Sequence, residues 1–217
     1  MPTIPSRSQE ITEDFLIVGE GEGDSAFFRH LLANRGIAGF QAEDAGGSGN
    51  FRNHLQGLNI RSGINRLRAL IVVGDNEETP DDCFKRIRSH LKKADLPVPN
   101  NPLELAPRTT GFPVAVMMIP FDKARGALES LLLKAATDHL VVPARCVGNY
   151  CQCINTSTWP KTASDKMRLR CMIAAAWPED PNIGLQWALS PDRKLIPLNH
   201  PCFDEVAQWL SDFPSLL

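Results

Sequence analysis

The sequence has no long apolar run and no excess of charge of one sign. None of its hydrophobic stretches approaches the ~20 residues that a membrane-spanning helix needs. Residues 1–8 contain two prolines and lack the apolar stretch of a signal peptide. Lys and Arg number 23 against 25 Asp and Glu, which gives a formal net charge of −2. We therefore expect a cytoplasmic protein without a membrane segment, in which any nucleic-acid-binding surface is local.

Cysteines are few, and they lack the paired spacing of a zinc ribbon. Of the six, only Cys146, Cys151 and Cys153 lie close together in the sequence, and no pair has two intervening residues. His200 and Cys202 could complete a zinc site only if the chain folded back. We expect reduced structural cysteines rather than a zinc site.

The composition is that of a globular protein. The 217 residues are 43% hydrophobic and 22% charged, which is enough for one sizeable core. Residues 1–13 are polar and read as a loose leader. We expect a single domain over residues 14–217, with a core at about 14–137 and a C-terminal elaboration at about 138–217.

A strand, a tight glycine-rich turn and a helix are predicted between residues 15 and 32. Four apolar residues, 15–18, precede a turn that carries Glu20, Glu22 and Asp24, and Asp24 is a good helix N-cap. A turn with three acids and no lysine would repel a bare phosphate, whereas carboxylates suit a cation such as Mg²⁺. The alternative is that Asp24 is only a cap and Glu20 only a solvated turn residue.

Residues 67–74, LRALIVVG, form the strongest predicted strand, of the kind that is buried on both faces. If the chain stays extended beyond it, Asp75 and Glu77 point the same way, a costly arrangement unless a divalent cation compensates it. The alternative is that these acids simply begin a loop. Further strands are predicted near 14–19, 38–43 and 112–119. Together they indicate an α/β fold, with a mainly parallel sheet flanked by helices on both faces.

Three later segments carry charged residues that we consider for function. The helix that starts at Pro80 places Lys85, Arg88 and Lys92 on one face, which is either solvated surface or a contact for a phosphate backbone. Glu129 lies in the first turns of a helix predicted from residue 126, where an acid is favourable in any case. Lys166 lies in a helix predicted over 162–177, and a last amphipathic helix spans about 203–213.

Glu20 and Asp24 after one strand, followed by Asp75-x-Glu77 after a second, resemble the Toprim domain. That domain is shared by topoisomerases, primases and the OLD-family nucleases, and the resemblance covers about residues 14–95. The Gly-x-Leu-Glu stretch at 126–129, the region around Cys146 to Cys151, the Asp-Lys pair at 165–166 and the closing His-Pro-x-Phe are similar to small stand-alone Toprim-like proteins. The family usually has aspartate where this chain has Glu77.

The resemblance implies a Toprim-like, Rossmann-like fold and a function for several residues. It assigns metal binding, of Mg²⁺ or Mn²⁺, to Glu20, Asp24, Asp75, Glu77 and Glu129. It makes Glu20 and Lys166 catalytic, with Lys166 near the scissile phosphate. The implied activity is that of a nuclease or another phosphoryl-transfer enzyme acting on DNA or RNA. The alternatives are a non-catalytic, metal-dependent module that binds nucleic acid or protein, and a hydrolase of small nucleotides. Each of these functions is compatible with a homo-oligomer or with a protein partner.

Overall fold

The computed structural model describes residues 10–106, 111–121 and 124–217. The predicted leader, 1–13, therefore lies largely outside the described residues. Its last part packs on the domain: Ile11 is only 2% exposed, and its N–H donates to the Ser62 carbonyl at 3.0 Å. The packed chain thus begins before residue 14.

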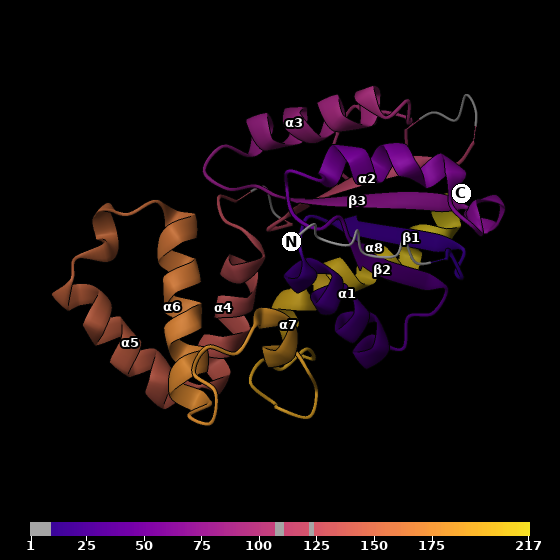
Figure 1. The fold of residues 1–217 in the computed structure, drawn as a ribbon. Helices are drawn as coiled ribbons and strands as arrows, with labels where there is room; N and C mark the ends of the chain where they lie inside the picture. Colours follow the sequence, from indigo (N-terminus) through magenta and orange to yellow (C-terminus); the bar gives the residue numbers. More distant parts are fainter. Residues whose placement is uncertain (1–9, 107–110, 122–123) are drawn as a thin grey trace, which may run out of the picture.

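A four-stranded, all-parallel sheet forms the centre of the molecule (Figure 1). The strand order is β2-β1-β3-β4, and the predicted α/β class and parallel sheet are confirmed. Each strand begins and ends no more than two residues from its predicted limits. The strands are β1 Phe15–Gly19, β2 Phe40–Asp44, β3 Ala69–Asp75 and β4 Val114–Ile119.

Helices cover both faces of the sheet, as a Rossmann-like fold requires. The α-helices are α1 Glu22–Arg35, α2 Phe51–Gly57, α3 Pro80–Lys93, α4 Leu128–His139, α5 Val141–Cys153, α6 Lys161–Ala176, α7 Leu185–Ala188 and α8 Asp204–Asp212. Short 3-10 helices are η1 Leu58–Ile60, η2 Ile64–Arg66, η3 Thr156–Thr158, η4 Pro201–Phe203 and η5 Phe213–Leu216. Helices α2 and α3 lie on one face, and α1, α4 and α8 on the other (Figure 1).

The strands are apolar throughout because each buries side chains on both faces. In β1, Leu16 and Val18 belong to the core under α2 and α3, whereas Phe15 and Ile17 belong to the core under α1 and α4. Successive side chains of a strand point to opposite faces, so a strand covered on both sides has no polar alternation. This explains why the run at 67–74 was the clearest strand signal.

The carboxyl ends of β1 and β3 lie at the point where the chain reverses its direction across the sheet. From β1 the chain passes through α1 to β2 on one side, and it then returns across β1 to β3 on the other. In open parallel sheets this switch point leaves a crevice in which ligands bind.

The C-terminal part of the chain first leaves the sheet and then returns to it. Helices α5 and α6 pack beyond α4, away from the sheet, whereas α8 lies beside the strands (Figure 1). At the end of α8, the ring of Phe213 lies 5.7 Å from that of Phe15 in β1 and 6.3 Å from that of Phe40 in β2. These three residues, the aromatic cluster, hold the end of α8 against the first two strands.

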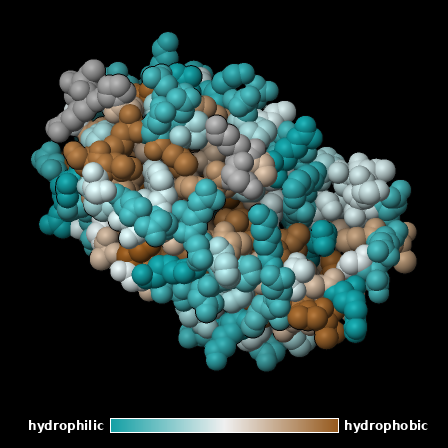
Figure 2. All heavy atoms as spheres, turned by 180° about the vertical axis from the view of Figure 1, so that it is seen from behind, coloured by the Kyte–Doolittle hydropathy of each residue, from teal (hydrophilic) through white to brown (hydrophobic). Residues whose placement is uncertain are grey.

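The surface seen from behind is mostly hydrophilic, with separate hydrophobic patches (Figure 2). In the part of the chain that the structure describes, no helix has the length and apolar character needed to cross a membrane.

Candidate functional site

The turn after β1 holds Asp24 directly against the end of the strand. Helix α1 begins earlier than predicted, with Gly21 rather than Asp24 as its N-cap. Asp24 instead lies at the third helical position, where Oδ2 accepts a hydrogen bond from the N–H of Gly21 at 2.9 Å. A side chain at Gly19 would place its Cβ 2.4 Å from the Cβ of Asp24, so glycine permits this close approach.

Asp75 is the last residue of β3, and it fixes the start of α4. Its Oδ1 accepts a hydrogen bond from the N–H of Leu128 at 2.9 Å, which leaves Oδ2 without a donor among the described residues. Glu129 follows Leu128 directly, so the same hydrogen bond brings Glu129 to the carboxyl edge of the sheet.

Burial and like charge together oppose ionisation at this edge. The pKa of Asp75 is raised well above its usual value, first by burial and then by the charges of Asp24 and Glu129. Burial raises the pKa of Asp24 from 3.8 to about 6; the Gly21 N–H opposes this rise, and Glu129 and Glu20 add to it. Glu20, Asp24, Asp75 and Glu129 therefore act on one another electrostatically, and we call them the acidic cluster.

Lys166 supplies the positive charge beside the acidic cluster. Its Nζ lies 3.9 Å from Oε2 of Glu129, and its charge lowers the pKa of Asp75. The side chain of Glu129 is 16% exposed and that of Lys166 is 48% exposed, so the lysine lies at the rim of the cluster.

Glu77 does not project beside Asp75, and the prediction of an extended chain there is wrong. Its φ of 47° lies in the left-handed region, and its backbone pairs with Gly126 instead of continuing β3. Its exposed carboxylate lies 3.7 Å from Nη2 of Arg86 and 3.8 Å from the thiol of Cys83. Glu77 therefore lies at α3 and not among the residues that raise the pKa values of Asp24 and Asp75.

The acidic cluster has the donor chemistry of a site for a hard cation. Carboxylate oxygens are the ligands that Mg²⁺ and Mn²⁺ prefer, and backbone N–H groups already orient Asp24 and Asp75. Over residues 10–106, 111–121 and 124–217, no three His, Cys, Asp or Glu side chains lie close enough together to hold a metal ion without rearrangement.

Two neighbouring residues that sequence reasoning missed organise the surroundings of the cluster. Asn76 is 1% exposed, and its Nδ2 donates to the carbonyls of Pro120 and Ala124, which holds the connection between β4 and α4. Glu78 reaches α6, where its Oε1 accepts from N–H and Oγ1 of Thr162 at 2.9 and 3.1 Å. An amide after a strand and an acid before a helix gave no sequence signal for either role.

The predicted basic face on α3 is present, with a different environment for each residue. Lys85 pairs with Asp82 at 3.1 Å, and Arg88 lies over the ring of Phe84 at 5.8 Å from its centroid. Lys92 is exposed one turn further along the helix. The six cysteines, the other candidates for a binding site, are all free thiols.

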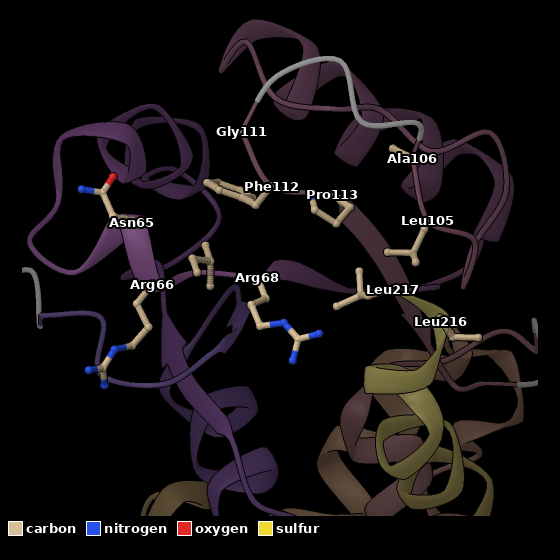
Figure 3. Close-up of a pocket in the computed structure, with 11 residues that line it drawn as sticks. Asn65, Arg66, Arg68, Leu105, Ala106, Gly111, Phe112, Pro113, Leu216 and Leu217 are labelled. Atoms are coloured by element: carbon tan, nitrogen blue, oxygen red, sulfur yellow. The ribbon is translucent and has the colours of Figure 1, made fainter.

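A cavity of about 550 Å³ lies at the opposite edge of the sheet, where β3 and β4 begin (Figure 3). Arg66 and Arg68 line it together with Leu105 and Leu217. Nη1 of Arg66 donates to the Thr12 carbonyl, and Arg68 lies 3.8 Å from Asp14, so both arginines already have partners. This cavity lies apart from the acidic cluster.

Comparison with known proteins gives a family without a known activity. Neither the curated proteins nor the solved structures contain a match to the chain. One family, described as a protein of unknown function, DUF3226, matches residues 14–214. Since this match spans both the sheet and the C-terminal helices, the chain belongs to the DUF3226 family.

Proposed function

We propose that this protein is a Mg²⁺- or Mn²⁺-dependent phosphoryl-transfer enzyme acting on nucleic acid, in concrete terms a nuclease. The observation that carries the proposal is the acidic cluster with its two raised pKa values, at the switch point of a parallel sheet. Keeping buried carboxylates together has an energetic cost that a divalent cation offsets. The resemblance of these residues to a Toprim domain points to the same chemistry.

In this proposal Asp24, Asp75 and Glu129 hold the metal. Each comes from a different element, and their oxygens already lie at one edge of the sheet. A bound divalent cation would neutralise the negative charge that develops on the phosphoryl oxygens. Glu77 is left out of the proposed ligand set because its carboxylate lies beside Arg86.

Glu20 and Lys166 have the catalytic roles in this proposal. Glu20 follows β1 directly and is assigned to accept the proton of the attacking water. Lys166 ends in a half-exposed ammonium group beside Glu129, and it is assigned to stabilise the negative charge of the phosphate in the transition state. Its exposed position lets a phosphate approach from solvent.

The second candidate is a metal-dependent binding module without catalysis. The observation in its favour is that no three His, Cys, Asp or Glu side chains among the described residues form a group that could hold a metal ion. A binding module would respond to metal as the enzyme does, but it would cleave nothing. A cleavage assay therefore separates the two.

The experiment compares wild type, Asp75→Asn and Glu77→Gln in thermal melts with EDTA, Mg²⁺ or Mn²⁺. A ligand at about 100 times its Kd stabilises the native state by about 2.7 kcal/mol, which is roughly 5–10 °C for a chain of this size. We expect this gain in wild type and in Glu77→Gln, the matched control outside the cluster. Asp75→Asn should lose most of the gain while its metal-free melting temperature stays equal or rises slightly.

Cleavage is measured on labelled single-stranded and duplex DNA and RNA with the same three proteins. The nuclease proposal expects metal-dependent products from wild type and Glu77→Gln, and none from Asp75→Asn. A melting temperature that does not respond to millimolar Mg²⁺ or Mn²⁺ would contradict the metal site. If metal raises the melting temperature but no substrate is cleaved, the result would contradict the nuclease and support the metal-dependent binding module.

A further inference from the structure

A second cavity, of about 220 Å³, lies on the α3 side of the sheet beside the acidic edge. We call it the α3 cavity. Asp81, Phe84, Lys85 and Arg88 line it from the helix, and Asn100 and Asn101 line it from the segment that precedes β4. The two cations outnumber the Asp81 carboxylate in this lining. Asn76, which follows Asp75 directly, also lines it. A ligand in this cavity would therefore lie next to the proposed catalytic edge, around the end of β3.

Arg88 has an unmet hydrogen-bonding requirement. Among the described residues, its buried Nε finds no hydrogen-bond acceptor and no carboxylate forms an ion pair with its guanidinium. A buried donor without an acceptor costs about 1–3 kcal/mol, so such a group calls for an explanation. Arg88 also lines the cavity, so an anionic ligand there supplies the missing negative charge.

Lys85 adds a second cation that is free to bind. Its ion pair with Asp82 joins two side chains that are 71% and 69% exposed, and pairs of this kind contribute little to stability. The ammonium group can therefore exchange Asp82 for a phosphate at small cost. Two cations on one helix face suit the backbone of a nucleic acid better than an uncharged ligand.

Phe84 and the two asparagines add the chemistry that recognises a base. Phe84 packs on the core with part of its surface, and it also contributes to the wall of the cavity. Aromatic side chains stack on unpaired bases of any sequence, and asparagine amides hydrogen-bond to base edges. A base stacked inside a duplex cannot reach a ring at the side of a helix, so the nucleotide must be unpaired.

We propose that the α3 cavity binds one unpaired nucleotide of a single-stranded nucleic acid. Its base packs against Phe84 and the Arg88 guanidinium that lies over this ring, and its phosphate contacts Lys85. This inference rests on the proposed function in one respect, that the ligand is nucleic acid, and it narrows the substrate to single strands. It does not depend on metal binding by the acidic cluster.

The test measures the anisotropy of a labelled 12-nucleotide single strand and of its duplex in EDTA, so that neither metal nor cleavage contributes. The variants are Phe84→Leu, which keeps an apolar side chain without a ring, Arg88→Gln and Asn100→Ala. Lys93→Gln is the matched control for Arg88→Gln, because it removes one positive charge from the same helix outside the cavity. Asn100 is exposed, so its substitution leaves the core intact.

We expect tighter binding of the single strand than of the duplex. Loss of one stacked base weakens binding by roughly 5–150-fold, so Phe84→Leu should show a loss in that range. Arg88→Gln should weaken binding more than Lys93→Gln, and Asn100→Ala should weaken it for some bases more than for others.

Equal affinity for single strand and duplex, or unchanged binding by Phe84→Leu and Asn100→Ala together, would overturn the inference. Absence of any binding in EDTA would overturn it as well. Failure of the proposed function has a different signature: the single strand binds in the α3 cavity, yet no metal response and no cleavage follow. The two ideas can therefore fail separately.

Discussion

The carboxyl groups of Asp24 and Asp75 lie where burial and neighbouring acids disfavour their ionised form. Both pKa values are raised, so between the unfolded and the folded pKa the native state binds more protons than the unfolded chain. Their ionisation therefore destabilises the metal-free fold as pH rises. Glu43 behaves in the opposite way, because hydrogen bonds from His54 and Arg61 lower its pKa despite its burial.

Asp24→Asn isolates this effect because an asparagine oxygen can still accept from the Gly21 N–H. The wild-type penalty begins near the unfolded pKa of 3.8, grows between the two pKa values, and is nearly complete about one unit above the folded pKa of about 6. We expect the variant to gain stability over wild type at about pH 8, on the order of 3 kcal/mol, and roughly half as much at about pH 5. Urea unfolding in EDTA at the two pH values measures the difference. A gain that is equal at both would contradict a raised pKa.

The position of a site residue could be predicted from the sequence where the residue directly follows a strand. It could not be predicted for residues further along the loop. Glu20 and Asp75 follow apolar runs directly, so the sequence was sufficient to place them at the carboxyl edge. Glu77 lies only two residues further, but its left-handed φ turns it to Arg86. Such a conformation is uncommon for a residue other than glycine, and the sequence gave no sign of it.

Helix α6 brings Lys166 to the cluster, and Glu78 fastens the start of that helix. Both hydrogen bonds of Glu78 go to Thr162, one turn before Lys166. They satisfy a backbone N–H that would otherwise have no partner in the first turn of the helix. The end of β3 therefore carries Asp75, and the loop that follows it positions the lysine through Glu78 and α6.

Glu78→Ala should loosen the first turn of α6 and speed hydrogen exchange of its amides. Hydrogen bonds from Thr162 lower the pKa of Glu78, so the wild-type protection should persist at neutral pH and weaken as pH falls through the folded pKa of Glu78. Amide exchange followed by mass spectrometry measures both effects. Glu77→Ala, which removes the adjacent acid, is the control and should leave α6 unchanged. Equal protection of α6 in all three proteins would show that Glu78 does not anchor it.

Elements were predictable in proportion to how regularly they bury apolar residues. Helix α3 buries Cys83, Ile87 and Leu91 at helical spacing, and its predicted start at Pro80 is confirmed. Helix α5 buries Val147 alone within a stretch of thirteen residues, so no apolar stripe marked it as a helix. Packing against α6, which no local pattern reveals, accounts for its place.

The aromatic cluster links the two ends of the described chain, and the stability of the whole molecule depends on it. Phe213 is completely buried between Phe15, Phe40 and Trp209. We expect Phe213→Ala to lower the free energy of unfolding by about 3–5 kcal/mol, through lost burial and the cavity that remains. Denaturant unfolding measures this loss. Leu216→Ala, at a side chain that is half exposed, should change stability by less than about 0.5 kcal/mol.

The same cluster affects how the chain folds while it is being synthesised. Phe15 and Phe40 leave the ribosome early, whereas Phe213, which covers them, is made after most of the chain. At about 5–20 residues per second, this face of the nascent sheet stays uncovered for on the order of ten seconds. During translation the part of the first two strands that Phe213 covers therefore stays open, beside the part that α1 and α4 cover, until the segment around Phe213 is made.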